Sequence, residues 1–131
     1  MADGLLYSMT AATSGMDAQS TRIRIVSENI ANADTPGFQR KTLSFRALVN
    51  DVEDPRAVVA SRVSLDDSDL ERVFDPAHPL ADAEGYYDGS NVSMIVEIAD
   101  AREAQRSYEA NLKMFDQTRQ MSASLMDLLR R

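Results

Sequence analysis

Apolar residues recur in alternating steps of four and three along both ends of this 131-residue chain. From Leu5 these steps lead to Ile30, and from Met94 they lead to Leu129, with few polar residues on the way. An average spacing of 3.5 residues keeps one stripe of a helix facing a partner helix over many turns. The pattern predicts a mainly α protein whose long N- and C-terminal helices pack as a coiled-coil-like hairpin.

The stripe residues are the candidates for contacts between chains in an assembly. They are Leu5, Met9, Met16, Ile23, Val26 and Ile30 in the first helix and Ile98, Tyr108, Leu112, Phe115, Met126 and Leu129 in the second. Two helices with one stripe each bury little surface, while ordering the backbone costs about 1–2 kcal/mol per residue. We therefore expect both ends to be largely unfolded in the free monomer and to become helical when neighbouring chains cover them.

Proline and glycine divide the chain into three segments of one structural unit. We expect a helix and a turn at 1–41, a small acidic segment that is irregular or contains β-structure at 42–90, and a helix at 91–131, where neither residue type occurs. At about 1.5 Å per residue, the last helix would be roughly 50–60 Å long. Such a length is typical of a stalk or a lattice rather than of a small globular domain.

Three stretches of the middle segment, at 42–45, 57–65 and 70–74, are β-branched or alternate between apolar and polar residues. Acidic residues and prolines bound them. β-branched residues favour strands, so the stretches are consistent with short strands or a small hairpin. Solvated acidic loops explain them equally well.

The net charge is −7, and the acidic residues gather in the middle segment. Residues 47–90 hold eleven acidic and three basic side chains, whereas both ends are close to neutral. The phosphate backbone of a nucleic acid would be repelled by such a surface, so we expect no nucleic-acid partner. The near-neutral ends are better suited to packing against other proteins.

The apolar runs are too short for a helix that spans a bilayer, which takes roughly 20 apolar residues. Residues 1–15 contain Asp3 and no Lys or Arg, so they lack the basic start of a cleavable secretory signal. We expect no membrane span, and any export without a cleaved signal peptide.

Enzymatic chemistry has little support in the sequence. His78 is the only histidine, and next to Pro79 it is read as a loop residue rather than a catalytic one. The acidic run that begins at Asp66 lacks the glycine and terminal glutamate of a calcium loop. With no cysteine and no phosphate-binding glycine motif, we expect no catalytic residue, metal site, cofactor or small-molecule substrate.

One motif follows the first apolar stripe and marks a helix end. Pro36 disfavours the helical conformation for Thr35, and Gly37 accepts a positive φ, so the chain is expected to turn there. The residues concerned are Asn29, Ala31, Asn32, Thr35, Pro36, Gly37 and Phe38. From the residues alone, a terminated amphipathic helix and a recognition element are about equally good interpretations.

The motif, with Ser14-Gly15-Met16 and Ala18-Gln19 before it, resembles the N-terminal signature of the bacterial flagellar axial proteins of rod and hook. In the second half, the stretches at 78–86 and 101–111 also resemble rod proteins of this family. The resemblance covers about residues 5–46 and 74–131 and leaves the acidic middle unmatched.

The resemblance implies a structural and non-enzymatic subunit. Such a protein would leave the cytoplasm unfolded through the flagellar export apparatus, without a cleaved signal. It would polymerise in the periplasm into the hollow helical drive shaft of the basal body. Its expected partners are copies of itself, other rod proteins, the membrane-ring protein and the export apparatus. A small acidic coiled-coil adaptor or type III export chaperone is the alternative, because such proteins share this size, charge and helical content.

Overall fold

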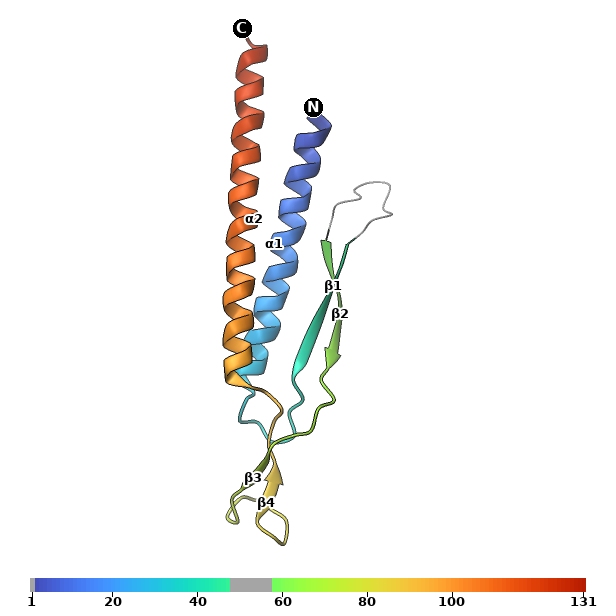
Figure 1. Ribbon diagram of the computed structural model, residues 1–131, viewed down its shortest axis with the longest axis vertical. Helices are drawn as coiled ribbons and strands as arrows, with labels where there is room; N and C mark the ends of the chain where they lie inside the picture. Colours follow the sequence, from blue (N-terminus) through green and yellow to red (C-terminus); the bar gives the residue numbers. More distant parts are fainter. Residues whose placement is uncertain (1, 48–57) are drawn as a thin grey trace.

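The chain forms a long helical hairpin with two small β-hairpins beside and below it (Figure 1). This computed structural model describes residues 2–47 and 58–131. The elements are α1 (Ala2–Ala31), β1 (Lys41–Ala47), β2 (Val58–Leu65), β3 (Arg72–Phe74), β4 (Tyr86–Asp88) and α2 (Met94–Leu129). The predicted mainly α architecture, with two long terminal helices around a middle segment that contains β-structure, is confirmed.

The two helices run antiparallel, with both chain ends at the open end of the hairpin (Figure 1). On α1, the stepped stripe supplies Ala12 and Val26 to the buried core. On α2, the buried face instead carries Ala104 and Thr118, with Glu97 at its start. Because α1 is the one element with extensive contacts to α2 among the described residues, these small and polar side chains form the interface of the hairpin.

The interface on α2 therefore lies partly off the expected stripe. Phe115 is half-buried, but Ile98, Tyr108, Leu112, Met126 and Leu129 are all exposed, Leu112 by 41% and Leu129 by 82%. The 4–3 spacing selects mainly large apolar residues, whereas α2 contacts α1 through smaller ones, such as Ala104 and Thr118. In the single chain, five of the large stripe residues are left uncovered.

Small residues at the interface allow a close approach of the two helices. A Cβ atom added at Gly15 would lie 2.8 Å from the side-chain oxygen and nitrogen of Asn111. Asn111 is itself held by a hydrogen bond of 2.9 Å that its Nδ2 donates to the carbonyl of Ser107. Gly15 lowers the helix propensity of α1 by roughly 1 kcal/mol, and this close contact is its structural role.

The β1–β2 hairpin covers a second face of α1, which the apolar stripe did not predict. Its strands pair antiparallel from Lys41 with Leu65 to Ala47 with Val58, with an irregularity after Ser44. Ser14 Oγ on α1 accepts a hydrogen bond of 3.1 Å from the Val58 N–H. The buried residues Ala18 and Ile25 follow Ser14 at helical spacing on the same face. The strand interpretation is thus confirmed over acidic loops for 42–45, 58–65 and 72–74, whereas residues 70–71 are not in a strand and residue 57 lies outside the described residues.

The β3–β4 hairpin forms a tip that projects beyond the closed end of the helices (Figure 1). The rings of Phe74 and Tyr86 lie 5.0 Å apart across it. His78 lies in the connecting loop, as expected, and stacks on Tyr87 at 3.9 Å. Strand β4 was missed by the sequence analysis because three residues are too few to show a period.

Asp82 organises the loop of this tip. Its Oδ1 accepts hydrogen bonds from the N–H groups of Glu84 at 2.9 Å and Tyr86 at 3.0 Å, and its Oδ2 pairs with Arg72 at 2.8 Å. The N–H of Tyr86, followed by the contacts of Arg72 and Glu84, holds the pKa of the Asp82 carboxyl below its ordinary value, although burial opposes this. The carboxylate is thus the form that the folded loop favours.

Replacing Asp82 by Ala is expected to open this loop, because two backbone N–H groups lose their acceptor. Hydrogen exchange at the Tyr86 amide should accelerate, while Glu84→Ala in the same loop should leave it unchanged. Because the folded pKa is lowered, the stabilisation is complete above about pH 4 and is lost as the pH falls below it. Equal exchange in the two variants at pH 7 would contradict this role.

Candidate functional site

The residues of the motif that begins at Asn29 lie at the closed end of the hairpin, between the end of α1 and the start of β1. Asn29 is buried in the last turn of α1. Its Oδ1 accepts a hydrogen bond of 2.9 Å from the Lys41 N–H, and its Nδ2 donates one of 2.8 Å to the Lys41 carbonyl. One carboxamide thus satisfies both backbone groups of the first residue of β1. This pairing fixes where the strand begins relative to the helix.

The residues after Asn29 join the end of α1 to the chain segment that precedes α2. Asn32 Nδ2 donates to the Glu28 carbonyl at 2.8 Å, and Thr35 Oγ1 donates to Asn32 Oδ1 at 3.1 Å. Gly37 has the predicted positive φ, at 75°, and its N–H donates to the Gly89 carbonyl at 3.0 Å. The turn therefore both ends the helix and binds the base of the β3–β4 tip.

Ser90 and Asn91 make the matching contacts from the other side. Ser90 Oγ donates a hydrogen bond to the Ala33 carbonyl. Asn91 Oδ1 accepts one of 2.6 Å from the Arg40 N–H, while its Nδ2 donates to the Asp66 carbonyl at 3.0 Å. Asn91 thus links the segment before β1 to the segment after β2, immediately before α2 begins. Four chain segments meet at this point.

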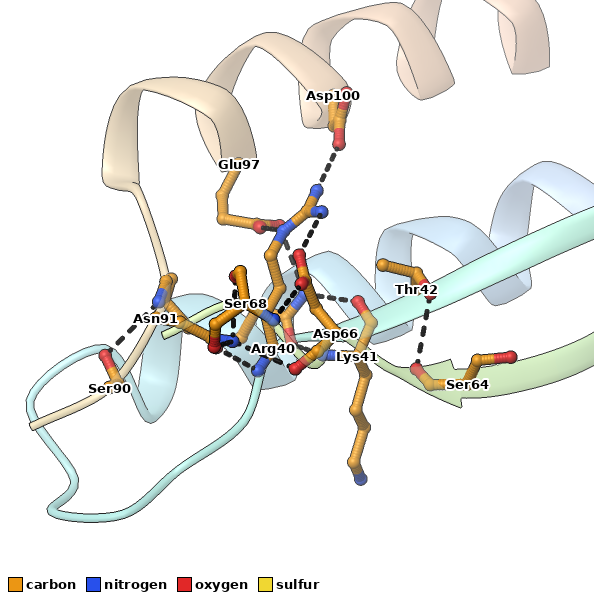
Figure 2. A network of polar contacts seen from close by, with 12 residues as sticks. Arg40, Lys41, Thr42, Ser64, Asp66, Ser68, Ser90, Asn91, Glu97 and Asp100 are labelled. Atoms are coloured by element: carbon orange, nitrogen blue, oxygen red, sulfur yellow. Dashed lines mark hydrogen bonds and ion pairs between the residues drawn. The ribbon is translucent and has the colours of Figure 1, made fainter. Parts of the chain in front are cut away.

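The centre of the junction is an ion pair between Arg40 and Glu97 (Figure 2). Glu97 lies in the first turn of α2 and is 0% exposed, and its second carboxylate oxygen accepts a hydrogen bond of 3.2 Å from Asn29. The Arg40 guanidinium also contacts Asp100 of α2 at 3.0 Å and Asp66 at 3.8 Å (Figure 2). A buried carboxylate requires a compensating cation, and Arg40 supplies it.

Electrostatics favours the charged forms of Arg40 and Asp66. Burial lowers the pKa of Arg40, but the hydrogen bond and charge of Glu97, with the charges of Asp100 and Asp66, outweigh it and raise the pKa above its ordinary value. The pKa of Asp66 is lowered, first by the backbone N–H of Ser68 and then by the Ser68 hydroxyl, with Arg40 contributing. At the junction, one guanidinium is therefore shared by three carboxylates, those of Glu97, Asp100 and Asp66.

A shallow cleft of about 330 Å³ adjoins the junction, lined by residues that include Arg22, Val26 and Phe45 as well as the ion pair. Within the described ranges 2–47 and 58–131, no group of three or more His, Cys, Asp or Glu side chains is placed to hold a metal ion. No helix in that part of the chain combines the length and apolar character that crossing a membrane takes. The polar groups of the cleft are engaged with one another, an arrangement suited to fixing elements in place.

Comparison with known proteins identifies the family. The model of the flagella basal body rod protein matches residues 9–39, and that of the flagellar basal body rod FlgEFG protein C-terminal region matches residues 83–128. The chain is 44% identical to the flagellar basal-body rod protein FlgC of Agrobacterium fabrum, over 98% of this chain and 97% of that protein. The chain belongs to the FlgC family of flagellar basal-body rod proteins. It is also 36% identical to FlgC of Aquifex aeolicus, over 84% of this chain and 86% of that protein, and 31% identical to FlgC of Bacillus subtilis, over 93% and 96%.

The residues of the axial-family motif differ in their burial in this FlgC-family chain. Asn29 is buried and Asn32 and Phe38 are half-buried, whereas Ala31, Thr35, Pro36 and Gly37 are exposed. The sequence analysis missed the partners of Asn29, namely Lys41 and Glu97, together with Arg40, Ser90 and Asn91. One signal was present for Glu97, since it is a lone carboxylate between Val96 and Ile98 in an apolar first turn.

Removing one member of the buried pair is expected to destabilise the junction unequally. Arg40→Met leaves the enclosed Glu97 without its cation and should cost about 3–5 kcal/mol. Glu97→Gln keeps an acceptor for Asn29 and leaves Arg40 its contact with Asp100, so it should cost about 1–3 kcal/mol. Hydrogen exchange at the Lys41 amide measures the free energy of opening the junction.

The control for these variants is Glu103→Gln. Glu103 is an exposed partner of Arg22 at 3.4 Å, so its loss should change the opening free energy by at most about 1 kcal/mol. An Arg40→Met variant no less stable than Glu103→Gln would show that the pair does not hold the junction together.

Proposed function

We propose that this chain is a structural subunit of the flagellar basal-body rod, and that its terminal helices polymerise into the hollow shaft that transmits torque. The observation that supports this most directly is the set of large apolar side chains that α2 leaves uncovered. A helix that belonged only to the two-helix hairpin would have its large apolar residues in the interface with α1 and polar residues elsewhere.

The uncovered residues form two stripes, one on each side of the α2 interface. Ile98, Leu112 and Met126 recur at intervals of fourteen residues on one flank. The second flank carries Val96, Met114, Met121 and Leu128, which also recur at whole numbers of helical turns. Helices from two neighbours, one on each flank, would bury both stripes. A subunit that contacts neighbours through different surfaces on its two sides builds an open helical array rather than a closed ring.

The open end of the hairpin offers a further apolar surface for such packing. Leu5, Leu6 and Met9 of α1 and Leu125 and Leu129 of α2 line a cleft of about 560 Å³ there. Met126 lines this cleft together with Met9, and methionine side chains adapt to partners of different shape, which suits a subunit that contacts non-identical neighbours. The candidate assembly residues of α1, which are half-buried or buried in the single chain, support the hairpin from within.

The remaining parts of the proposal follow from the family. We propose export in an unfolded state without a cleaved signal peptide, and a final place in the periplasmic rod. The partners would be copies of this chain, other rod proteins, the membrane-ring protein and the export apparatus. A chain without cysteine has no disulfide to prevent threading. We propose no enzymatic activity, and the stacking of His78 on Tyr87 supports a structural role for that side chain.

Leu112→Asp is expected to abolish swarming while the protein is still exported. Since Leu112 is exposed in the single chain, the substitution should leave the circular dichroism of the purified protein unchanged and act on assembly, where burying a charge costs at least several kcal/mol. Gln120→Asp, on the outer surface of the same helix, is the control and should swarm normally. Normal swarming of Leu112→Asp would show that this stripe is not buried in the rod interface.

The alternative, an acidic adaptor or export chaperone, differs in the behaviour of the free chain. A rod subunit should show fast hydrogen exchange at the open end of the hairpin until its neighbours are added, with protection limited to the junction around Asn29. An adaptor should instead be a helical dimer at micromolar concentration. Full and persistent protection of residues 5–33 in an isolated dimer would favour the adaptor and count against the rod subunit.

A further inference from the structure

The outer face of α2 near the closed end combines exposed apolar side chains with unpaired cations. Ile95 is 82% exposed and lies with Ile98, Arg102 and Arg106 along a shallow groove of about 630 Å³. Neither guanidinium has an ion-pair partner within the part of the chain that the structure describes, whereas Glu103 beside them pairs with Arg22. The groove therefore offers apolar contact and two available positive charges within about 16 Å of helix.

The β3–β4 tip has the complementary chemistry. Residues 66–88 hold eight acidic side chains and one basic one, and that cation, Arg72, is already engaged by Asp82 and Asp88. Leu80 at the end of the loop is 65% exposed. Asp75 and Glu84 lie on either side of it in sequence, and neither forms an ion pair with another described residue. An apolar residue between two carboxylates that form no ion pair with the described residues matches the groove of isoleucine and arginine.

The two surfaces of one molecule face different regions and do not meet. The tip projects below the closed end of the hairpin, whereas α2 rises from that end in the opposite direction (Figure 1). A second copy displaced along the long axis would place its tip beside the groove. Complementary potentials of this kind select a partner and fix its register.

We propose that the β3–β4 tip of one copy docks on the outer face of α2 in a second copy. Leu80 contacts Ile95, while the carboxylates of Asp75 and Glu84 pair with Arg102 and Arg106. The contact joins two different surfaces, so it can repeat along an open array. It rests on the proposed rod function and adds an axial contact to the lateral packing of the helices.

Cysteine cross-linking tests this contact in assembled basal bodies. The chain has no cysteine of its own, so Leu80→Cys and Ile95→Cys can be placed on separately tagged copies in one cell without background. Leu80 and Ile95 are both exposed, which makes a change of fold on substitution small. A short bismaleimide should link the two tags about tenfold more efficiently than it links Leu80→Cys to Gln120→Cys, because proximity raises the effective concentration of the thiols.

A charge exchange tests the register of the same contact. Arg106→Glu should reduce the cross-linking yield several-fold, and adding Glu84→Lys to the other copy should restore it. No rescue, or equal linking at Ile95 and Gln120, would overturn the docking geometry. If the Leu80→Cys chain links only to a different basal-body protein, the proposal that a second copy is the partner is wrong.

The same experiment distinguishes a failure of the tip contact from a failure of the rod function. If both tagged chains are recovered in basal bodies of swimming cells but do not cross-link, the tip contact is wrong and the rod function stands. If the unsubstituted chain is absent from purified basal bodies, the rod function fails and this contact fails with it.

Discussion

The structure depends on the neutralisation of one enclosed carboxylate, that of Glu97 in the first turn of α2. Glu97 is fully buried and pairs with Arg40, and the backbone around Arg40 is held by Asn29 at Lys41 and by Asn91 at Arg40 itself. The start of α2, the end of α1 and the start of β1 are thereby fixed by a single set of contacts. Directional bonds of this kind specify one arrangement, whereas apolar packing of two thin helices would tolerate several.

Local signals in the sequence were sufficient for both helices and for the positions of β1, β2 and β3, but not for β4 or for the contacts between elements. The helices follow from periodicity, and the turn at Gly37 follows from the conformational freedom of glycine, since its φ is positive as expected. The face by which α2 meets α1 could not be found by counting large apolar residues, because Ala104 and Thr118 form it. The pairing of Arg40 with Glu97 joins residues 57 positions apart, and no periodic pattern reports such a contact.

The choice of small residues for the hairpin interface has a consequence for assembly. Close helix packing at Gly15 and Ala104 uses little side-chain volume, so leucine, isoleucine and methionine are left for the flanks of α2. The single chain therefore has a thin core and exposes much of its apolar surface. The free energy that an ordinary domain gains by burying such residues internally becomes available here only through neighbouring chains.

The distribution of charge complements this arrangement of apolar surface. Free chains that expose long apolar stripes are at risk of associating in the wrong place, and like charges on them reduce that association. In this chain the excess of negative charge lies almost entirely between residues 66 and 88, away from the helices that would pack laterally. Repulsion between tips then opposes side-by-side clustering with the tips in register, while a staggered neighbour that presents cations to the tip is favoured. The apolar stripes thus favour lateral packing of helices, and the charged tip favours a staggered neighbour. The junction at Glu97 fixes the tip and the helices relative to each other.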